Sequence, residues 1–327
     1  MLNSRVIVLF SLVLLVVPLA GADDAPRFKW TTEAESGTTD LSYGNVKVIR
    51  YMHQFDRSTK ESAHATYKVY HHVFGPGGGP LITKGPGGLY THHRGLYVGW
   101  NKTGFDGTVN DFWHCRKGEH IRHIRFLEQS ADSSQGRMTA EIHWVGAQGK
   151  QVIQETRTVS VSLLVTSDQL PPGWQIDWRT KLESRRGNIT LQGDRQHAGF
   201  QFRAAQEVAA AKGARYIRPV GFPEQSEAFQ VGDKDTPPKH VDLDWLAMTF
   251  QVQGKRYTVE YFADPDLPKP SRYSERPYGR FGAYFKTTLT AAAPLEMRYR
   301  LHVTTGTAPD RTQIQKRYDA FLESLQR

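Results

Sequence analysis

The densest group of residues able to do chemistry lies between Tyr90 and His123. This window holds five of the chain's 13 histidines, and two more lie upstream at positions 71 and 72. Imidazole changes charge near neutral pH and is a common metal ligand. The five are His92, His93, His114, His120 and His123. Histidines packed this densely among carboxylates and aromatic side chains predict a polar pocket, and we expect the functional site here.

Several side chains in and near this window suit acid–base chemistry or substrate binding. The candidate catalytic groups are His92, His93, His114 and Glu155. Histidine and glutamate exchange protons near neutral pH, which lyase, epimerase and hydrolase chemistry all require. The candidates for substrate binding are Arg94, Trp100, Trp113, Arg157, His197 and Arg203. Arginine suits an anionic or hydroxyl-rich ligand, whereas a tryptophan ring either fills a core or forms a platform for a sugar ring.

The histidine cluster matches no standard metal motif, because the sequence contains neither HExxH nor paired CxxC. His92 or His93 could still bind a divalent metal ion together with His114 and Glu119. Adjacent side chains on an extended backbone point to opposite faces, so we expect only one of His92 and His93 to face a shared site. The single cysteine, Cys115, cannot form an intrachain disulfide, and we expect it to be buried and inert.

The segment 150–166 alternates like a strand but carries two charges on its apolar face. Ile153 and Val159 belong to that face. The same period of two places Glu155 and Arg157 there as well. Burying ionised groups is costly unless they are paired or line a wet cavity. The sequence therefore allows two interpretations, a structural ion pair or a pocket shared with the histidines.

Alternation with a period of two dominates the remaining sequence and predicts antiparallel strands. Further predicted strands cover 137–144, 174–183, 246–252, 257–261 and 297–303. Helix signals are scarce, and the clearest begins at Pro309, where apolar residues repeat at helical spacing. This pattern predicts an all-β fold, a large antiparallel β-sandwich with a short C-terminal helix, as a single domain over residues 23–327. We expect the turn-rich segments 76–88 and 264–280 to lie near the histidine cluster.

Residues 1–22 are typical of a signal peptide, with a basic start, an apolar run and the small residues Ala20-Gly21-Ala22. We therefore expect a periplasmic or secreted protein. No later segment is long and apolar enough to span a bilayer, so a membrane-spanning protein is not expected. The net charge of +9 is spread along the chain. Nucleic acid is an unexpected partner for such a protein, whereas a carbohydrate or another small polar ligand fits.

Five segments carry a resemblance to known proteins: THHRGLYVGW, DFWHCRKGEHIRH, QETRTVSVS, QHAGFQFRAAQEV and RPYGRFGAYF. In these segments, and in their order, the chain resembles a family of bacterial proteins labelled methane oxygenase PmoA-like. The resemblance covers nearly all of the chain after residue 22 and assigns no catalytic residues. It implies an exported protein of carbohydrate metabolism, with a β-sandwich similar to the sugar-binding supersandwich of mutarotases.

Three functions are compatible with these features. The leading hypothesis is a carbohydrate-active enzyme that acts on a glycan or sugar derivative through a pocket of histidine, glutamate and arginine. The second is a non-catalytic sugar-binding or scaffold protein, which would bind a glycan without forming product. The third is a metal-dependent oxidase or oxygenase, which would require a bound metal ion.

Overall fold

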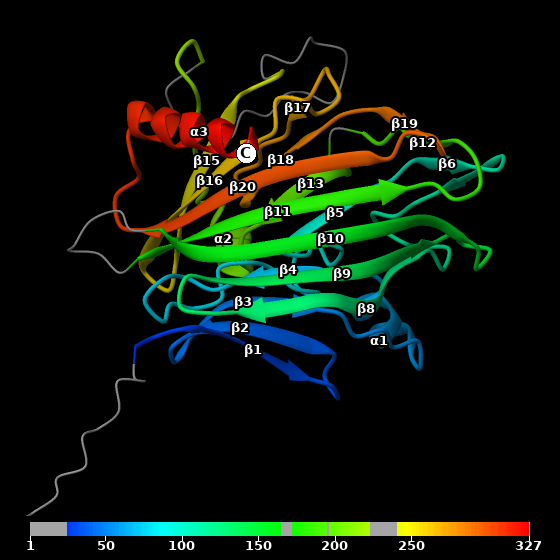
Figure 1. Cartoon of the computed structure of the whole chain (residues 1–327), viewed down its shortest axis with the longest axis horizontal. Coiled ribbons are helices and arrows are strands. Elements are labelled where there is room, and N and C mark those ends of the chain that lie inside the picture. Colours follow the sequence, from blue (N-terminus) through cyan, green and yellow to red (C-terminus); the bar gives the residue numbers. More distant parts are fainter. Residues whose placement is uncertain (1–24, 165–171, 195, 223–240, 327) are drawn as a thin grey trace, which may run out of the picture.

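Two large antiparallel sheets form the molecule, and a smaller sheet lies at one end. The computed structural model describes residues 25–164, 172–194, 196–222 and 241–326, so the predicted signal peptide 1–22 lies outside the described residues. Figure 1 shows the long strands β8 to β11 and β20 crossing the molecule side by side. The predicted all-β sandwich with a short C-terminal helix is confirmed.

Sheet A contains eight strands. Their spatial order is β1 (Phe28–Glu33), β2 (Thr38–Tyr43), β3 (Val46–Met52), β4 (Tyr70–Val73), β5 (Leu96–Trp100), β13 (Ala198–Arg203), β18 (Arg280–Tyr284) and β17 (Arg272–Tyr273). Sequence neighbours pair from β1 to β5, but β13 joins β5 after a long excursion through the other sheet. Ala198 lies opposite Trp100 in that ladder, which brings two distant parts of the sequence together.

Sheet B also contains eight strands. Their spatial order is β14 (Arg215–Ile217), β15 (Trp245–Val252), β16 (Lys255–Ala263), β20 (Leu295–Thr305), β11 (Gly173–Glu183), β10 (Gln151–Leu164), β9 (Gln135–Val145) and β8 (His120–Ala131). The small sheet contains β19 (Thr287–Leu289), β12 (Ile189–Leu191), β6 (Thr103–Phe105) and β7 (Thr108–Asn110). The helices are α1 (Lys60–Thr66), α2 (Gln206–Ala211) and α3 (Arg311–Leu325). The alternating segments of the sequence are all strands here, although positions 165 and 166 of one prediction lie outside the described residues.

The predicted strands 246–252 and 257–261 are parts of β15 and β16, which form a hairpin. Val252 pairs with Lys255, which leaves a loop of Gln253 and Gly254. Both loop residues have positive φ, 49° and 72°, as a type I′ turn requires. Glycine adopts this conformation without strain, so Gly254 suits the second loop position.

The main core lies between the inner faces of the two sheets. Trp178 of β11 packs on Phe200 of β13 with ring centroids 4.7 Å apart, which joins the sheets directly. A second apolar cluster lies between sheet B and α3, where Phe262 meets Tyr318 and Phe321. Burial of aromatic rings supplies much of the stabilisation in both places.

Helix α3 begins two residues later than the proline suggested. Asp310 is its N-cap and accepts a hydrogen bond from the amide of Gln313 at 2.8 Å, while the Gln313 side chain accepts one from the Asp310 amide at 3.1 Å. Pro309 therefore precedes the cap and is not in the first turn. The reciprocal pair satisfies two amides that a helix start otherwise leaves without partners.

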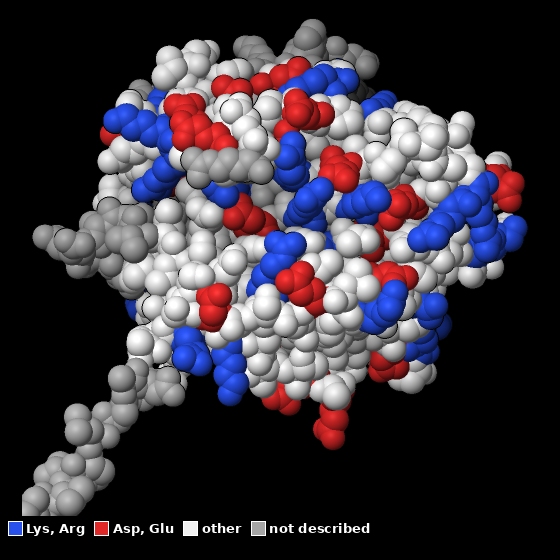
Figure 2. Space-filling model, viewed as in Figure 1, with Lys and Arg blue, Asp and Glu red and all other residues white. Residues whose placement is uncertain are grey.

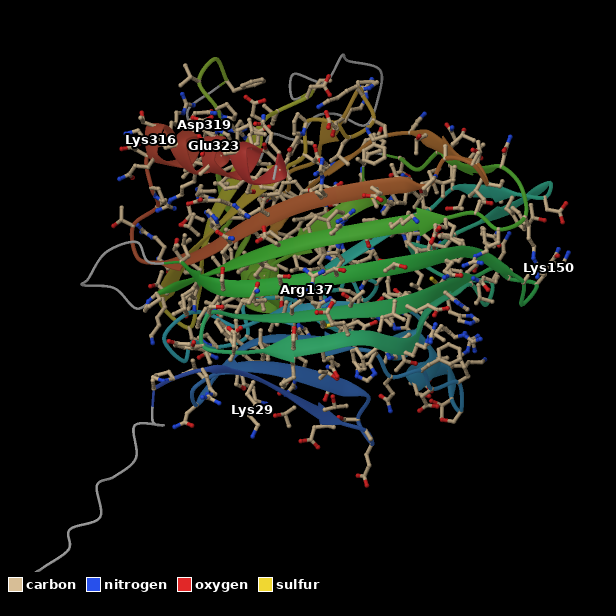
Figure 3. All side chains as sticks on the ribbon, in the orientation of Figure 1. Lys29, Arg137, Lys150, Lys316, Asp319 and Glu323 are labelled. Atoms are coloured by element: carbon tan, nitrogen blue, oxygen red, sulfur yellow. The ribbon has the colours of Figure 1, made fainter. Side chains whose placement is uncertain are left out.

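The outer face of sheet B is covered by paired charges. Arg300 binds Asp177, and Arg179 binds Glu296. Figure 2 shows basic and acidic side chains interspersed over this side, and Figure 3 shows Arg137 on the sheet with Lys316, Asp319 and Glu323 on α3. The positive net charge therefore does not gather on this face. Across the described part of the chain, no helix is long and apolar enough to cross a membrane.

Candidate functional site

The site lies on the outer face of sheet A, beneath two loops. On β13, Phe200 and Phe202 point into the main core, so Gln201 and Arg203 point to the opposite face, as predicted. Both of these polar side chains are nevertheless buried. The reason is that segments around residues 84–95 and 111–119 cover this face, and Tyr97 and Trp113 pack together beneath them.

A glycine lets one of these loops approach the sheet closely. A Cβ atom on Gly99 of β5 would lie 2.8 Å from the carbonyl oxygen of Phe112. The amide of Phe112 donates to the carbonyl oxygen of Trp100 at 3.0 Å. Only glycine leaves room for this contact, and it places the next two residues, Trp113 and His114, over β5.

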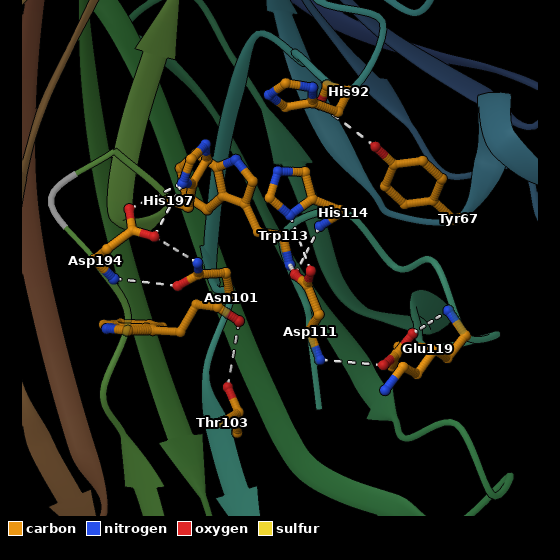
Figure 4. Close-up of polar contacts among 12 residues, drawn as sticks. Tyr67, His92, Asn101, Thr103, Asp111, Trp113, His114, Glu119, Asp194 and His197 are labelled. Atoms are coloured by element: carbon orange, nitrogen blue, oxygen red, sulfur yellow. Dashed lines mark hydrogen bonds and ion pairs between the residues drawn. The ribbon is translucent and has the colours of Figure 1, made fainter. Parts of the chain in front are cut away.

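Three histidines from three separate segments converge at this point. His92 precedes β5, His114 follows Trp113 in the second loop, and His197 immediately precedes β13. One ring nitrogen of each lies within 4.8 Å of those of the other two. The ring centroids are 4.9 Å apart for His92 and His114, and 4.8 Å apart for His114 and His197. Figure 4 shows the three rings turned toward one another.

Two of these rings are held by carboxylates at the same spacing. The Nδ1 atom of His114 lies 2.9 Å from Oδ2 of Asp111, and Nδ1 of His197 lies 2.9 Å from Oδ1 of Asp194. Each aspartate precedes its histidine by three residues. A carboxylate acceptor favours the tautomer protonated at Nδ1, so the Nε2 lone pair of each ring is available to a ligand.

The two aspartates are themselves fixed by local hydrogen bonds. Asp194 accepts a bond from the side-chain amide of Asn101 at 2.6 Å, and its own amide donates back to Asn101 at 3.1 Å. Asp111 accepts bonds from the amides of Trp113 and His114, both at 2.9 Å. Figure 4 shows these contacts behind the histidines. The rings are therefore oriented before any ligand binds.

Burial disfavours the charged form of His92 and His197. Desolvation, with the nearby Lys68 ammonium, lowers the pKa of His92 to about 2. Desolvation also lowers the pKa of His197, although its hydrogen bond with Asp194 opposes that shift. Burial acts to raise the pKa of Asp194, but the hydrogen bonds from His197, Gln196 and Asn101, together with the attraction to His197, outweigh it, so the pKa lies below its ordinary value. Neutral imidazole beside ionised carboxylate is the protonation state that metal binding requires.

The geometry suits a tetrahedral metal ion with one open position. Zinc binds imidazole nitrogen at about 2.0–2.1 Å, so three ligands in a tetrahedral arrangement lie about 3.4 Å from one another. The nitrogens here need only small ring rotations to close from within 4.8 Å. The torsion that rotates a histidine ring is broad, which allows this adjustment at His92, the ring that no aspartate holds. Three histidines with a vacant fourth position are the ligand set of a catalytic metal ion.

His93 lies beside this group but faces another way. Its ring stacks on Tyr90 at 4.9 Å and lies 5.8 Å from Tyr278, and it is nearly perpendicular to the ring of His92. The expectation that one member of the pair faces the shared site is consistent with this arrangement. Tyr278 comes from the segment 264–280, so that turn-rich segment does reach the histidine cluster.

An open depression of about 410 Å³ adjoins the cluster at His197. Hydrogen-bonding side chains and one aromatic ring make up most of its wall. The lining residues are Lys102, Gln192, Gly193, Asp194, Gln196, His197, Tyr284 and Lys286. A volume of this size is within the range of small-molecule sites, and its donors and acceptors suit a ligand rich in hydroxyl groups.

Glu155 and Arg157 lie elsewhere, between the two sheets. Both side chains are fully buried, and Arg157 Nε donates to Glu155 Oε1 at 2.7 Å. Glu155 also accepts bonds from Trp144 Nε1 at 2.7 Å and from Thr180 Oγ1 at 2.6 Å. The guanidinium of Arg157 lies over the ring of Trp178. These contacts favour the structural pair over a pocket shared with the histidines.

The remaining predicted residues have varied positions. Trp100 is in the main core, where its indole nitrogen donates to the carbonyl of Phe285. Arg94 donates to the backbone carbonyls of Thr91, His93 and His64, which ties loop 84–95 to α1.

Glu119 accepts bonds from the amides of Asp111 and Lys117 and so braces the second loop without joining the histidines. Desolvation raises the pKa of Cys115 to about 12, so its thiol stays protonated, as expected for an inert cysteine.

Sequence reasoning missed the supporting residues of the site. Asp111 and Asp194 were not identified as partners of histidines, and Lys68 and Asn101 were not considered as site residues. One signal was present: Asp111-Phe-Trp-His114 and Asp194-Arg-Gln-His197 share the spacing Asp-x-x-His. A repeated spacing of this kind places a hydrogen-bond acceptor next to each imidazole, so it indicates that His114 and His197 belong to one site.

Comparison with known proteins gives the chain a family but no activity. A family model matches residues 38–319. The chain belongs to a family of unknown function, DUF6807. No curated protein matches it. Among solved structures, it is similar to a putative kojibiose phosphorylase from the human microbiome, at 9% sequence identity and a TM-score of 0.35, over 92% of this chain and 35% of that one. The chain therefore spans about a third of that protein's length.

Proposed function

We propose that this member of DUF6807 is a metal-dependent enzyme that acts on a glycan or sugar derivative. The observation that carries the proposal is the convergence of His92, His114 and His197, two of them oriented by aspartates. Carboxylate–histidine–metal arrangements recur in metalloproteins because the carboxylate fixes the ring and strengthens its lone pair. An ion pair or a core histidine needs no such convergence of three ring nitrogens.

The protein's part in the chemistry is to position the ion and the substrate. A divalent ion at such a site polarises a carbonyl or hydroxyl oxygen and lowers the pKa of bound water. His92, His114 and His197 would hold it, and Asp111 and Asp194 set the direction of two rings. His93 is close enough to act as an acid or base, because its ring lies 4.7 Å from that of His92.

The carbohydrate part of the proposal is supported by what surrounds the histidines. The depression beside His197 offers amide, carboxylate, ammonium and phenol groups, which can bind several hydroxyls of one sugar ring. On the other side, the rings of Tyr90 and Tyr278 pack together with centroids 4.4 Å apart, and Tyr90 is 40% exposed. A partly exposed aromatic pair offers an apolar face to a sugar ring.

Metal content and turnover test the proposal together. We expect the protein purified without chelator to contain about one transition-metal ion per chain, and His114→Ala to lose it. His93→Ala is the matched control, because it removes a neighbouring imidazole from outside the three; it should keep the metal and lower turnover. Screening sugars and polysaccharides with and without a chelator then assigns the substrate. Wild-type protein that binds no metal, or His114→Ala that retains it, refutes the proposal.

Two other functions have specific support. The pair of Tyr90 and Tyr278 favours a non-catalytic sugar-binding protein, which would show saturable glycan binding without product. The three-histidine site, with the label methane oxygenase PmoA-like, favours a metal-dependent oxidase or oxygenase. The identity of the ion separates the enzymes, because zinc has no redox chemistry whereas copper and iron do. A zinc ion would therefore exclude the oxidase and the oxygenase, and hydrolase, lyase or epimerase chemistry would remain.

We also propose export to the periplasm or medium as one domain, residues 23–327, after removal of the signal peptide 1–22. The small residues Ala20-Gly21-Ala22 after an apolar run support it. N-terminal sequencing of the protein recovered from the producing cells should begin at Asp23. A retained Met1 would contradict the proposal.

A further inference from the structure

Buried basic side chains lie around the histidine site. Lys68 and Arg203 are each 1% exposed, and both interact with the ring of Trp113, which in turn contacts His197. The ammonium of Lys68 lies 4.0 Å from the ring centroid of Tyr97 and donates to the carbonyl oxygen of Trp113 at 2.5 Å. Burial lowers the pKa of Lys68 well below its ordinary value, whereas a buried arginine keeps its charge. Burying a cation without an anionic partner is strongly unfavourable, so the position of Arg203 requires an explanation.

A second arginine lies directly opposite Arg203. In the ladder between β13 and β18, Arg203 faces Arg280, which is also 1% exposed. Like charges directly opposite one another destabilise an antiparallel pair. Burial lowers the pKa of Arg203 to about 9, so this side chain keeps its proton at pH 7. The two charges therefore repel one another inside the protein unless an anion lies between or beside them.

One edge of the Arg203 guanidinium has no partner. Its Nη1 atom donates to the side-chain oxygen of Gln201 at 2.9 Å and to the carbonyl of Phe202 at 3.4 Å, both neutral acceptors. Its Nε and Nη2 atoms are buried and have no hydrogen-bond partner among the described residues. The same holds for the hydroxyl of Tyr97 and the indole nitrogen of Trp113. Four buried donors thus lack an acceptor in one small region.

The edge formed by Nε and Nη2 is the one that binds carboxylates elsewhere in this protein. Arg50 donates from Nε and Nη2 to the two oxygens of Asp40, at 2.6 and 2.8 Å. Arg300 does the same with Asp177, at 2.6 and 3.2 Å. Paired N–H groups match the two oxygens of a carboxylate, so this edge of Arg203 has the geometry of a carboxylate site.

We propose that the substrate carries a carboxylate, as a uronic acid does, and that this group binds the Nε–Nη2 edge of Arg203. The proposal rests on the proposed function, because it names the substrate class of the same site. Trp113, which lies over Arg203, belongs to the loop segment 111–119, and the proposal requires this side chain to move so that a ligand group can enter. Tyr97 and Trp113 donate to the same carboxylate, and the sugar ring extends from it toward the three histidines.

Binding of matched sugars to the purified protein tests this directly. Glucuronate and galacturonate are compared with glucose and galactose, which differ only in lacking the carboxylate, and with glucose 6-phosphate, at constant ionic strength. We expect the uronates to bind and the neutral sugars to bind at least tenfold more weakly. A uronate at about 100 times its Kd should raise Tm by roughly 5 °C. Equal binding of charged and neutral sugars overturns the proposal, and preference for the phosphate overturns the carboxylate assignment.

Arginine variants then locate the carboxylate. Arg203→Gln removes the charge and the paired edge, and uronate affinity should fall at least about 30-fold. Arg203→Lys keeps the charge without the paired edge and should recover only part of that loss. Arg50→Gln is the matched control, since its edge already has a carboxylate, and it should bind uronate normally. Unchanged affinity in Arg203→Gln overturns the proposal.

The experiment separates this proposal from the metal site. Metal content is measured on the same samples, and Arg203→Gln should retain the ion because Arg203 is not among the three histidine ligands. Metal-loaded protein without preference for uronates would contradict the carboxylate site alone. Metal-free wild-type protein that still prefers uronates would contradict the metal site alone. If the Arg203 variants do not fold, the comparison of sugars on the wild-type protein decides the question.

Discussion

Replacing Glu155 by glutamine tests the buried ion pair on the inner face of sheet B. The carboxylate accepts three hydrogen bonds inside the core, from Arg157, Thr180 and Trp144. Glutamine has nearly the same shape but is neutral, and one of its two terminal atoms is a donor. If the amide nitrogen takes the position of Oε2, it faces the Trp144 indole N–H, and two donors then oppose one another.

The cost follows from what the change leaves behind. Arg157 is fully buried, and two of its nitrogens already lack partners among the described residues, so Glu155 is the anion that compensates its charge. Removing one partner of a buried pair costs about 3–5 kcal/mol, because the other charge stays buried. For a domain of this size, 1 kcal/mol corresponds to about 2 °C in Tm, so Glu155→Gln should melt roughly 6–10 °C below the parent.

A thermal melt and a metal assay on the same variant decide the matter. The matched control is Asp177→Asn, which breaks another arginine–carboxylate pair on the outer face of sheet B, where Asp177 is 36% exposed. That change should cost below about 1 kcal/mol. Metal content should stay unchanged in both variants. An unchanged melt for Glu155→Gln, together with loss of metal or turnover, would refute the structural role and place Glu155 in the site.

Three further predictions follow from individual contacts. Asp111→Asn should weaken metal binding by about 10–100-fold in a chelator competition, whereas Asp106→Asn, an exposed carboxylate in the same window, should leave it unchanged. Burial lowers the pKa of His72 to about 3 and that of His93 well below 6.5, so the unfolded chain takes up protons that the folded chain does not. Stability should therefore be independent of these groups above pH 6.5 and fall below it by about 1.4 kcal/mol per pH unit for each; unfolding midpoints unchanged between pH 7 and 5 would contradict this. Asp310→Ala should destabilise the protein by about 1 kcal/mol through loss of the α3 cap, seen as a lower urea midpoint, and an equal midpoint would show that the cap contributes nothing.

The strands were predictable because most have one face toward the core and one face toward water. That arrangement gives β9, β11 and β20 a sequence that alternates with a period of two. The same alternation placed Glu155 and Arg157 on the inner face of their strand. Helices α1 and α2 have seven and six residues. Such short elements contain fewer than two full turns, so they leave no periodic signal to detect.

The order of strands within the sheets could not be predicted from local pattern. Strand β20 lies between β16 and β11, and β13 lies between β5 and β18. Such pairings depend on contacts between residues far apart in sequence. The same difficulty explains the site: His92 and His114 share the dense window, whereas His197 reaches them only because β13 pairs with β5. The sequence therefore ranked His197 as a substrate-binding residue and did not group it with the other two.

Burial of the polar face of sheet A was also unpredictable. Alternation correctly placed Gln201 and Arg203 opposite the core, and such a face is normally exposed. Here loops cover it, and Tyr97 and Trp113 form a small apolar cluster beneath them. Which loop lies over which strand depends on close approaches such as that at Gly99, which no local pattern reveals.

The metal site is the central claim, and anomalous X-ray diffraction tests it most directly. Crystals of the protein purified without chelator should show one anomalous peak between His92, His114 and His197, about 2.0–2.1 Å from one nitrogen of each ring. Data collected on both sides of the absorption edge would identify the element. Stoichiometric metal with its peak elsewhere, or no peak in crystals grown with added zinc, would contradict the account.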